Sequence, residues 1–226
     1  MKIVFLGDSL TAGHFAGSYI NALREQFPDH EIINAGVGGN TVLNLLARVE
    51  DDVLTHEPDG VFVMVGGNDA VSYTQPKTRS YYKQVQNVPD GVVTPELFGQ
   101  TYRDLIHELQ LAFLPTWVGL PPAEYNIDVV RAQRQFNAIA ADVARSATVP
   151  VLDLMSHFVP DDDQLPQRGP IDIGFINEIG KRASSGWSDY EAEQKRLGYH
   201  YTFDGLHLVP ASAVKMARII GEFLEL

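Results

Sequence analysis

Short apolar runs alternate along this chain with longer segments whose apolar residues recur at helical spacing. Five of the apolar runs are predicted to be strands: 2–6 (KIVFL), 31–34, 61–65 (VFVMV), 113–119 and 149–154. Helices are predicted between and after them: 18–27, from Asn40 to about Val53, 94–112, 127–147 and from Pro210 onward. The alternation predicts an α/β fold, a three-layer α/β/α sandwich whose doubly wound, mostly parallel five-stranded sheet has flavodoxin-like order.

Two segments do not follow this alternation. Residues 70–93 are polar and aromatic without a clean period, and we predict a loop there. Residues 156–203 contain no predicted strand and only a short helix near 188–197. A segment of this length is usually functional or disordered. We interpret residues 1–226 as one domain in which 156–203 is an insertion, either a lid or wall over a site or a surface excursion or dimer contact.

Composition narrows the classes of function. The chain carries 17 Lys and Arg against 29 Asp and Glu, a formal net charge of -12, which repels the phosphates of nucleic acid and of anionic membranes. No apolar run approaches the roughly 20 residues that span a bilayer, and no secretory leader is recognisable, so a cytoplasmic protein is expected. Cysteine is absent, which excludes disulfides and thiolate chemistry. A homo-oligomer is left open.

Polar and glycine-rich residues follow each of the first three predicted strands: 7–10 (GDSL), 36–40 (GVGGN) and 66–69 (GGND). In flavodoxin-like order the first strand lies between the second and the third, so these three loops meet at the carboxyl edge of the sheet, where such folds bind ligands. Each loop taken alone is also compatible with ordinary turn chemistry. Their convergence makes a site the stronger interpretation.

A fourth segment, 202–207 (TFDGLH), precedes the last predicted helix. Asp204 and His207 are three residues apart, so the carboxylate can hold one imidazole nitrogen and leave the other free as a base. The last helix is expected to pack beside the first, which brings this segment towards Ser9. No group of residues has convincing metal-ligand spacing, and we predict no metal and no cofactor.

Together, these four blocks resemble the SGNH hydrolase family, also called GDSL esterases and lipases, and they occur in the family's order. The resemblance implies a three-layer fold and cleavage of a small-molecule ester through a Ser-His-Asp triad and an acyl-enzyme. On the matching positions it implies Ser9 as nucleophile, His207 as base and Asp204 as its partner. It further implies that Ser9, Gly39 and Asn68 supply the oxyanion hole.

This assignment is chemically consistent, because a serine hydroxyl needs a base to accept its proton and the tetrahedral oxyanion needs preorganised donors. Asp8 is expected to bond backbone groups of its own loop, and among the other histidines His14 and His200 are the candidates for a position near the site. Family members commonly follow the Asp-x-x-His block with Pro-Asn, whereas 208–210 here reads LVP. Short-chain, acetyl-sugar, lysophospholipid-type and thioester substrates all remain open.

A flavodoxin-like module that binds phosphate or flavin is the alternative. Residues 7–13 would then form a phosphate loop at the start of a helix. This alternative accounts for Ser9 and Thr11, but it leaves Asn68, Asp204 and His207 without a role.

Overall fold

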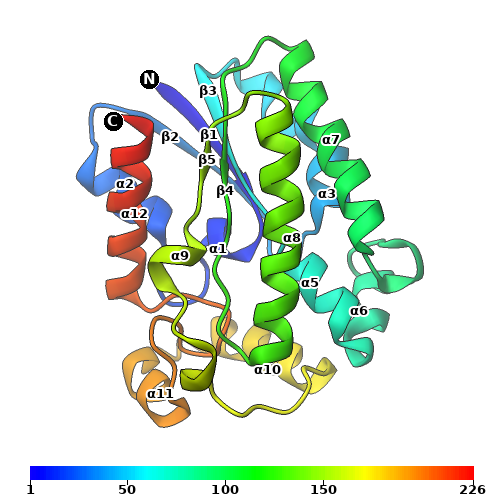
Figure 1. Cartoon of the computed structure of the whole chain (residues 1–226). Helices are drawn as coiled ribbons and strands as arrows, with labels where there is room; N and C mark the ends of the chain where they lie inside the picture. The colour runs from blue at the N-terminus through cyan, green and yellow to red at the C-terminus, as the bar shows by residue number, and fades with distance from the viewer.

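The computed structural model describes residues 1–226, apart from the side chain of Ala183. Five strands form one sheet in the order β2-β1-β3-β4-β5, with every pairing parallel (Figure 1). The strands are β1 (Lys2–Gly7), β2 (Glu31–Gly36), β3 (Gly60–Met64), β4 (Thr116–Gly119) and β5 (Val151–Leu152). The predicted fold class and strand order are confirmed. The last two strands are shorter than predicted, because Pro115 and Pro150 precede them and proline cannot donate to a ladder.

Helices cover both faces of this sheet. They are α1 (Ser9–Ala12), α2 (Tyr19–Gln26), α3 (Val42–Ala47), α4 (Val49–Asp52), α5 (Gly67–Thr74), α6 (Arg79–Gln84), α7 (Pro95–Leu111), α8 (Ile127–Ser146), α9 (Met155–Phe158), α10 (Ile173–Ser184), α11 (Tyr190–Leu197) and α12 (Pro210–Leu224). Short 3-10 turns lie at Leu54–His56, Pro76–Thr78, Pro89–Gly91 and Asp162–Gln164. Helices α2 and α12 lie on one side of the sheet, and α3, α7 and α8 on the other (Figure 1).

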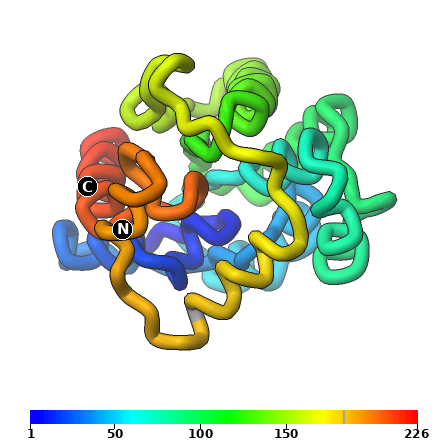
Figure 2. Tube along the Cα trace, turned by 90° about the horizontal axis from the view of Figure 1, so that it is seen from below, coloured from blue at the N-terminus to red at the C-terminus, as the bar shows by residue number. Residues whose placement is uncertain are grey.

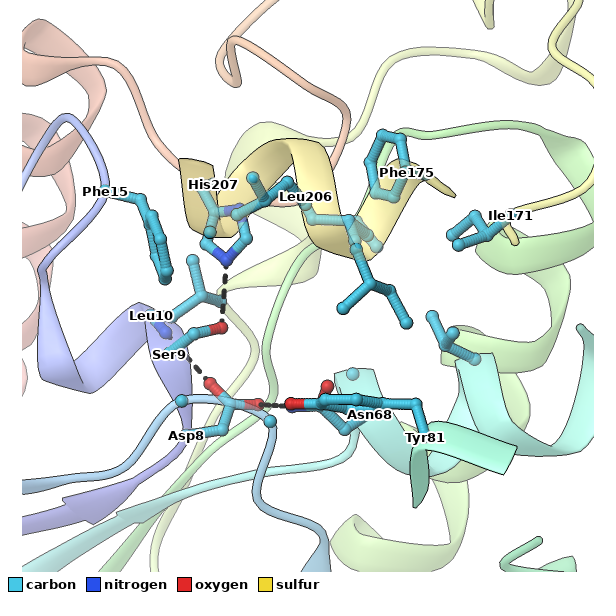
Figure 3. A pocket seen from close by; sticks show the side chains of 18 of the residues that line it. Asp8, Ser9, Leu10, Phe15, Asn68, Tyr81, Ile171, Phe175, Leu206 and His207 are labelled. Carbon is cyan, nitrogen blue, oxygen red and sulfur yellow. Dashed lines mark hydrogen bonds between the residues drawn. The ribbon is translucent and has the colours of Figure 1, made fainter. Parts of the chain in front are cut away.

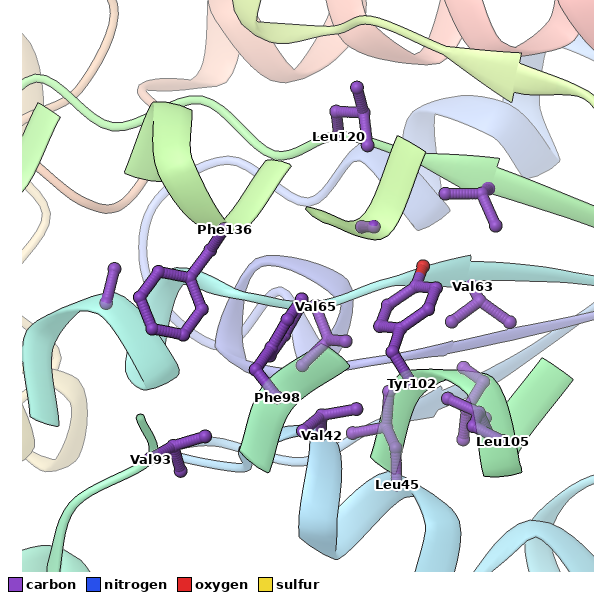
Figure 4. Packing of buried hydrophobic residues seen from close by; sticks show 14 of the residues in the cluster. Val42, Leu45, Val63, Val65, Val93, Phe98, Tyr102, Leu105, Leu120 and Phe136 are labelled. Atoms are coloured by element: carbon purple, nitrogen blue, oxygen red, sulfur yellow. The ribbon is translucent and has the colours of Figure 1, made fainter. Parts of the chain in front are cut away.

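Alternate residues of β1 enter the two cores, as the two-residue period of a strand requires. Ile3 and Phe5 join the cluster under α2 and α12, whereas Val4 and Leu6 join the larger cluster under α7 and α8. In that larger cluster the aromatic rings of α7 and α8 pack over the residues of β3 (Figure 4). Because helices pack on both faces, the strands are held in place, and so are the starting points of the loops that follow them at the carboxyl edge.

The prediction of a loop over 70–93 is wrong. Most of α5 and all of α6 lie in this segment, with 3-10 turns after each of them. These helices are too short to show a full apolar repeat, and side-chain bonds to backbone groups hold the segment together. Ser72 Oγ accepts from the backbone N–H of Val93 at 3.0 Å, and Thr78 Oγ1 donates to the carbonyl of Gln75 at 2.8 Å.

The helix predicted from Asn40 breaks at Arg48 into α3 and α4, and Thr41, not Asn40, is its N-cap. The Asn40 side chain instead joins a network: its Nδ2 donates to Gln86 Oε1 at 3.1 Å, and its Oδ1 accepts from Arg48 Nε at 2.9 Å. Arg48 Nη2 also donates to the carbonyl of Gly7 at 2.8 Å. The guanidinium therefore joins the loop after β2 to the end of β1.

Residues 156–203 contain more helix than predicted. The expected helix near 188–197 is α11, but α10 was not anticipated. Two glycines, Gly174 and Gly180, weaken its sequence signal, whereas Asp172 caps it by accepting from the backbone N–H of Phe175 at 3.0 Å. Seen from below, the segment arcs around the carboxyl edge of the sheet (yellow to orange in Figure 2).

Candidate active site

The loops after β1, β2 and β3 lie together at the carboxyl edge, as the strand order requires. The side chain of Asn68 connects them, because its Nδ2 donates to the carbonyl of Asn40 at 3.0 Å and to Asp8 Oδ2 at 3.3 Å. The Asn68 Oδ1 accepts from the hydroxyl of Tyr82 at 2.9 Å, which fixes the orientation of the amide. Asp8, Asn40, Asn68 and Tyr82 thus form one hydrogen-bonded network at the carboxyl edge of the sheet.

The loop before α12 places His207 beside this network. Its Nε2 lies 3.0 Å from Ser9 Oγ, although the two residues are 198 positions apart in the chain (Figure 3). On the other side of the ring, Nδ1 lies 2.7 Å from Asp204 Oδ2. Asp204 is 4% exposed and His207 6% exposed. Ser9, His207 and Asp204 therefore form a continuous row of hydrogen-bonded side chains.

The turn around Asp204 fixes this geometry. Its Oδ1 accepts from the backbone N–H groups of Leu206 and His207, at 2.9 and 2.8 Å, so the carboxylate closes the turn and faces the imidazole at once. Gly205 has a φ of +95°, and a Cβ there would meet the backbone of Tyr125. Only glycine fits both the conformation and the space.

The electrostatics of the row follow from its burial and its carboxylates. Burial of His207 opposes the imidazolium, but the charge and hydrogen bond of Asp204, with the charge of Asp8, outweigh it and raise the pKa of His207 above its usual 6.5. The ring of Phe15 packs against the imidazole, with 4.6 Å between ring centroids. The imidazole is thus held in one orientation and made more basic than in water.

Two residues that line the cavity beside Ser9 Oγ, Ser9 itself and Gly39, have backbone N–H groups without a partner among the described residues. Gly39 has a φ of +81°, and a side chain there would occupy the space of the Tyr81 hydroxyl and the Gln86 amide. Both hydrogens of the Asn68 amide are engaged, the longer bond being the one to Asp8. Ser9, Gly39 and Asn68, the residues that the resemblance assigns to an oxyanion hole, all line the cavity beside Ser9.

Asp8 bonds its own loop as expected, accepting from the backbone N–H of Leu10 at 3.0 Å. Its second oxygen faces Asn68, a contact that the sequence did not predict. Burial raises the pKa of Asp8 to about 6, while Leu10, His207, Asn68 and Arg48 act against this rise. Asp8 therefore helps to hold the Asn68 amide in place by accepting a hydrogen bond from it.

Asp69 is a second buried carboxyl that sequence reasoning missed. It is fully buried and accepts from the backbone N–H of Val42 at 3.0 Å, at the start of α3. Its Oδ2 has no partner among the described residues, and burial raises its pKa to about 7. In the sequence, Asp69 stands out only because it follows Asn68, and the segment 66–69 (GGND) is also typical of an ordinary turn.

These shifts predict that stability falls with rising pH. Asp8 and Asp69 keep their protons in the folded state up to about 6 and 7, whereas both pKa values are near 3.8 when unfolded. Their contribution is therefore fully present below pH 3.8 and lost as pH rises through 6 to 7. We expect the free energy of unfolding, from urea titrations, to be about 4 kcal/mol larger at pH 5 than at pH 8.

Asp69→Asn is expected to shrink this difference, and Asp161→Asn, at an exposed site, to leave it unchanged. An unfolding free energy that rises from pH 5 to pH 8 would contradict the assignment of the two buried protons.

Glu124 is the other residue that the sequence did not reveal. It is fully buried, and its Oε1 accepts from the backbone N–H groups of Tyr201 and Thr202 and from the Thr202 hydroxyl, at 2.7–2.9 Å. Its Oε2 accepts from the backbone N–H of His200 at 2.8 Å. One carboxylate thus anchors the segment that leads to Asp204. A lone acid after two prolines carries no periodic signal.

Glu124→Gln is expected to lower the free energy of unfolding by about 2–4 kcal/mol. The glutamine amide would turn a donor towards backbone donors that now share the carboxylate. Urea unfolding at pH 7 measures this, with Glu25→Gln on the exposed face of α2 as the matched control. A loss below 0.5 kcal/mol would mean that the carboxylate does not hold this segment.

The two other candidate histidines are not part of the site. His14 is exposed and is not among the residues that line the cavity beside Ser9. The His200 ring lies 3.3 Å from Glu124 and does not line that cavity either. These two histidines are close in sequence to Ser9 and to Asp204, but neither lines the cavity.

A cavity of about 360 Å³ opens beside Ser9 and His207 (Figure 3). Part of its wall comes from 156–203, since Ile171 and residues 175–177 and 179–180 line it. Among the described residues, no group of His, Asp or Glu side chains could hold a metal ion. Within the described residues, no helix is both long enough and apolar enough to cross a bilayer.

Fold and side chains together define an α/β/α protein with a Ser-His-Asp row at the carboxyl edge of its sheet. Residues 5–183 match the model of the GDSL-like lipase/acylhydrolase family, and the chain belongs to this family. The resemblance inferred from the four sequence blocks is thereby confirmed. The matched region ends before Asp204 and His207, so the geometry alone brings these two residues into the site.

Individual relatives are more distant. An arylesterase from Vibrio mimicus is 29% identical over 125 residues, which cover 48% of this chain and 62% of that protein. An acetylxylan esterase from Geobacillus stearothermophilus is 35% identical over 86 residues, covering 30% and 39%. This chain therefore spans less than two thirds of the length of either relative.

Solved structures share the whole fold. The acetyl xylan esterase AlAXEase superimposes with a TM-score of 0.68 at 20% identity, covering 99% of this chain and all of that one. Axe2, an acetylxylan esterase from Geobacillus stearothermophilus, gives 0.65 at 20% identity over 100% and 94%. At this identity the likeness concerns the fold alone.

Proposed function

We propose that this protein is a serine esterase that cleaves carboxylic esters through an acyl-enzyme. The observation that carries the proposal is the row Ser9–His207–Asp204, with its 3.0 and 2.7 Å contacts, at the mouth of an apolar cavity. Membership of the GDSL-like lipase/acylhydrolase family supports it.

In the first half of the reaction, Ser9 Oγ attacks the ester carbonyl carbon while His207 Nε2 accepts the hydroxyl proton. Asp204 holds the Nδ1–H of the ring and stabilises the imidazolium that forms. The bond to the alcohol oxygen then breaks, and His207 gives the proton to that oxygen. The products of this half are the free alcohol and an acyl group bound to Ser9.

In the second half, water replaces the alcohol. His207 accepts a proton from the water as its oxygen attacks the acyl carbon, and returns that proton to Ser9 Oγ as the acid leaves. In both halves, negative charge develops on the carbonyl oxygen. The N–H groups of Ser9 and Gly39 have no other acceptor among the described residues, and Asn68 supplies a third donor by releasing its long bond to Asp8.

The phosphate- or flavin-binding alternative has less support. Thr11, which would face a phosphate, is fully buried, and its Oγ1 shares a 2.8 Å hydrogen bond with the Tyr19 hydroxyl. The helix after the loop has only four residues, which gives little dipole for an anion. The hydrolase proposal, in contrast, uses Asn68, Asp204 and His207.

Covalent labelling tests the proposal directly. A fluorophosphonate is expected to form a single adduct that peptide mass spectrometry locates on Ser9, and to abolish hydrolysis of p-nitrophenyl butyrate in proportion. Labelling at another residue, or full turnover after labelling of Ser9, would refute it.

The pH profile follows from His207. The base must be neutral to accept the Ser9 proton, and its pKa is raised, so kcat/KM for an uncharged ester should increase with pH through a midpoint above 6.5. Asp8 ionises nearby with a pKa of about 6, so the observed midpoint belongs to both groups. Initial rates between pH 5 and 9 measure it. A flat profile, or a midpoint below 6, would contradict the role of His207.

A further inference from the structure

The cavity beside Ser9 is larger than an acetyl group requires. Its volume is about 360 Å³, space for about a dozen water-sized groups at ~30 Å³ each. An acetyl group adds a single methyl beyond the carbonyl. Most of the space would therefore stay empty, or filled with water against an apolar wall, with an acetyl ester bound.

The chemistry of the wall changes with distance from Ser9. We call the part of the lining formed by Val71, Ala123 and Ile171 the closed end, because these residues are each 3% exposed or less and belong to one hydrophobic cluster. Leu206 and Phe175 lie between Ile171 and the nucleophile (Figure 3), and Ile176, which follows Phe175 in α10, also lines the cavity. The closed end thus presents three apolar side chains to the cavity.

Most polar groups of the lining lie near the nucleophile or are already bonded; the exception is Asn177 of α10, which is exposed and has no side-chain hydrogen bond among the described residues. Asp8, Asn68 and His207 surround Ser9. The hydroxyl of Tyr82 is bonded to Asn68, and that of Tyr81 to the Gln86 amide at 2.9 Å. A sugar hydroxyl placed at the closed end would lose its hydrogen bonds to water and gain none, which is costly.

Helix α10 is held in place as part of this wall. Its Arg182 bonds Glu193 of α11 at 2.9 Å, and Glu193 is also bonded by Arg196 at 2.6 Å. Phe175 packs edge-on against Tyr125, with 5.1 Å between ring centroids. Because the apolar wall is formed in advance, a ligand that contacts it does not have to order it first.

We propose that the acyl group of the natural ester is an apolar chain of about six to eight carbons, lying between α5 and α10, with the remaining space of the cavity left for the carbonyl and the alcohol part. This inference rests on the proposed esterase function and names its substrate class. Ile176 and Ala123 are the specificity-determining positions, one on the α10 wall and one at the closed end.

The test compares p-nitrophenyl esters that differ only in acyl length. kcat/KM is expected to rise about fourfold for each methylene from acetate to hexanoate, because each added group is buried against the wall. Ile176→Asn, which places an amide in that wall, should lower the hexanoate-to-acetate ratio at least tenfold. Lys181→Asn, on the exposed side of the same helix, should not change it. Ala123→Phe, which fills the closed end, should lower the ratio as well.

Binding to the Ser9→Ala variant separates the two proposals. There, the hexanoate ester should bind at least 50-fold more tightly than the acetate ester by calorimetry. Equal affinities, or a wild-type enzyme that cleaves acetate as fast as hexanoate in a Ser9-dependent way, would overturn the acyl-chain inference and leave the esterase proposal standing. Absence of Ser9-dependent turnover with any ester would refute the esterase proposal, and the affinities would still decide whether the cavity is an acyl site.

Discussion

Ser9→Ala is expected to lower kcat for p-nitrophenyl hexanoate by a factor on the order of 10⁶. The variant loses the only oxygen that lies within 3.0 Å of His207 Nε2 in the described structure, so no covalent intermediate can form. Its fold should be unchanged, because Ser9 Oγ makes its one hydrogen bond to His207 and the α1 turn is capped by Asp8. Steady-state rates and circular dichroism measure the two properties together.

Ser18→Ala is the matched control. Ser18 caps α2 by accepting from the backbone N–H of Asn21 at 3.2 Å, so its loss should cost about 1 kcal/mol of stability and leave kcat intact. Ser9→Ala retaining more than one per cent of wild-type turnover would exclude Ser9 as the nucleophile.

Asp204→Asn is expected to lower kcat by a factor on the order of 10⁴ with little change in KM. The asparagine carbonyl oxygen can still accept from the backbone N–H groups of Leu206 and His207. Its amide then faces His207 Nδ1 and donates to it, which places the ring proton on Nε2, towards Ser9. In that tautomer the imidazole cannot accept the hydroxyl proton.

The pH profile distinguishes this effect from a loss of structure. Since Asp204 helps to raise the pKa of His207, the acidic midpoint of kcat/KM should move down in Asp204→Asn. Exposed Asp161→Asn should alter neither rate nor midpoint. An unchanged midpoint together with a lower rate would show that Asp204 acts only on the turn.

Much of this site could be predicted from the sequence, because the strand order decides which loops are neighbours. Once β1 is known to lie between β2 and β3, the loops that carry Ser9, Gly39 and Asn68 must be neighbours. Asp204 and His207 form a local pair whose geometry a single turn decides. These five residues needed no knowledge of side-chain packing.

The supports of the site could not be predicted, because long-range packing creates them. Glu124 meets its partners only when the segment after β4 lies beside residues 200–202. Asp69 gains its raised pKa from burial beneath α3, which no local pattern encodes. The shape of the cavity depends on α10, whose two glycines obscured the helix in the sequence.

Ser9 and His207 are 198 positions apart, and the last strand of the sheet, β5, already ends at Leu152. A chain emerging from the ribosome presents its serine first and can pair all five strands long before its imidazole is made. Until α12 docks beside α2, such a nascent chain has a complete sheet and an inert hydroxyl. Under the proposed mechanism, ester cleavage therefore begins only after His207 has been made and α12 has docked, and proteolytic loss of the segment from Asp204 through α12 would silence the enzyme while sparing its sheet.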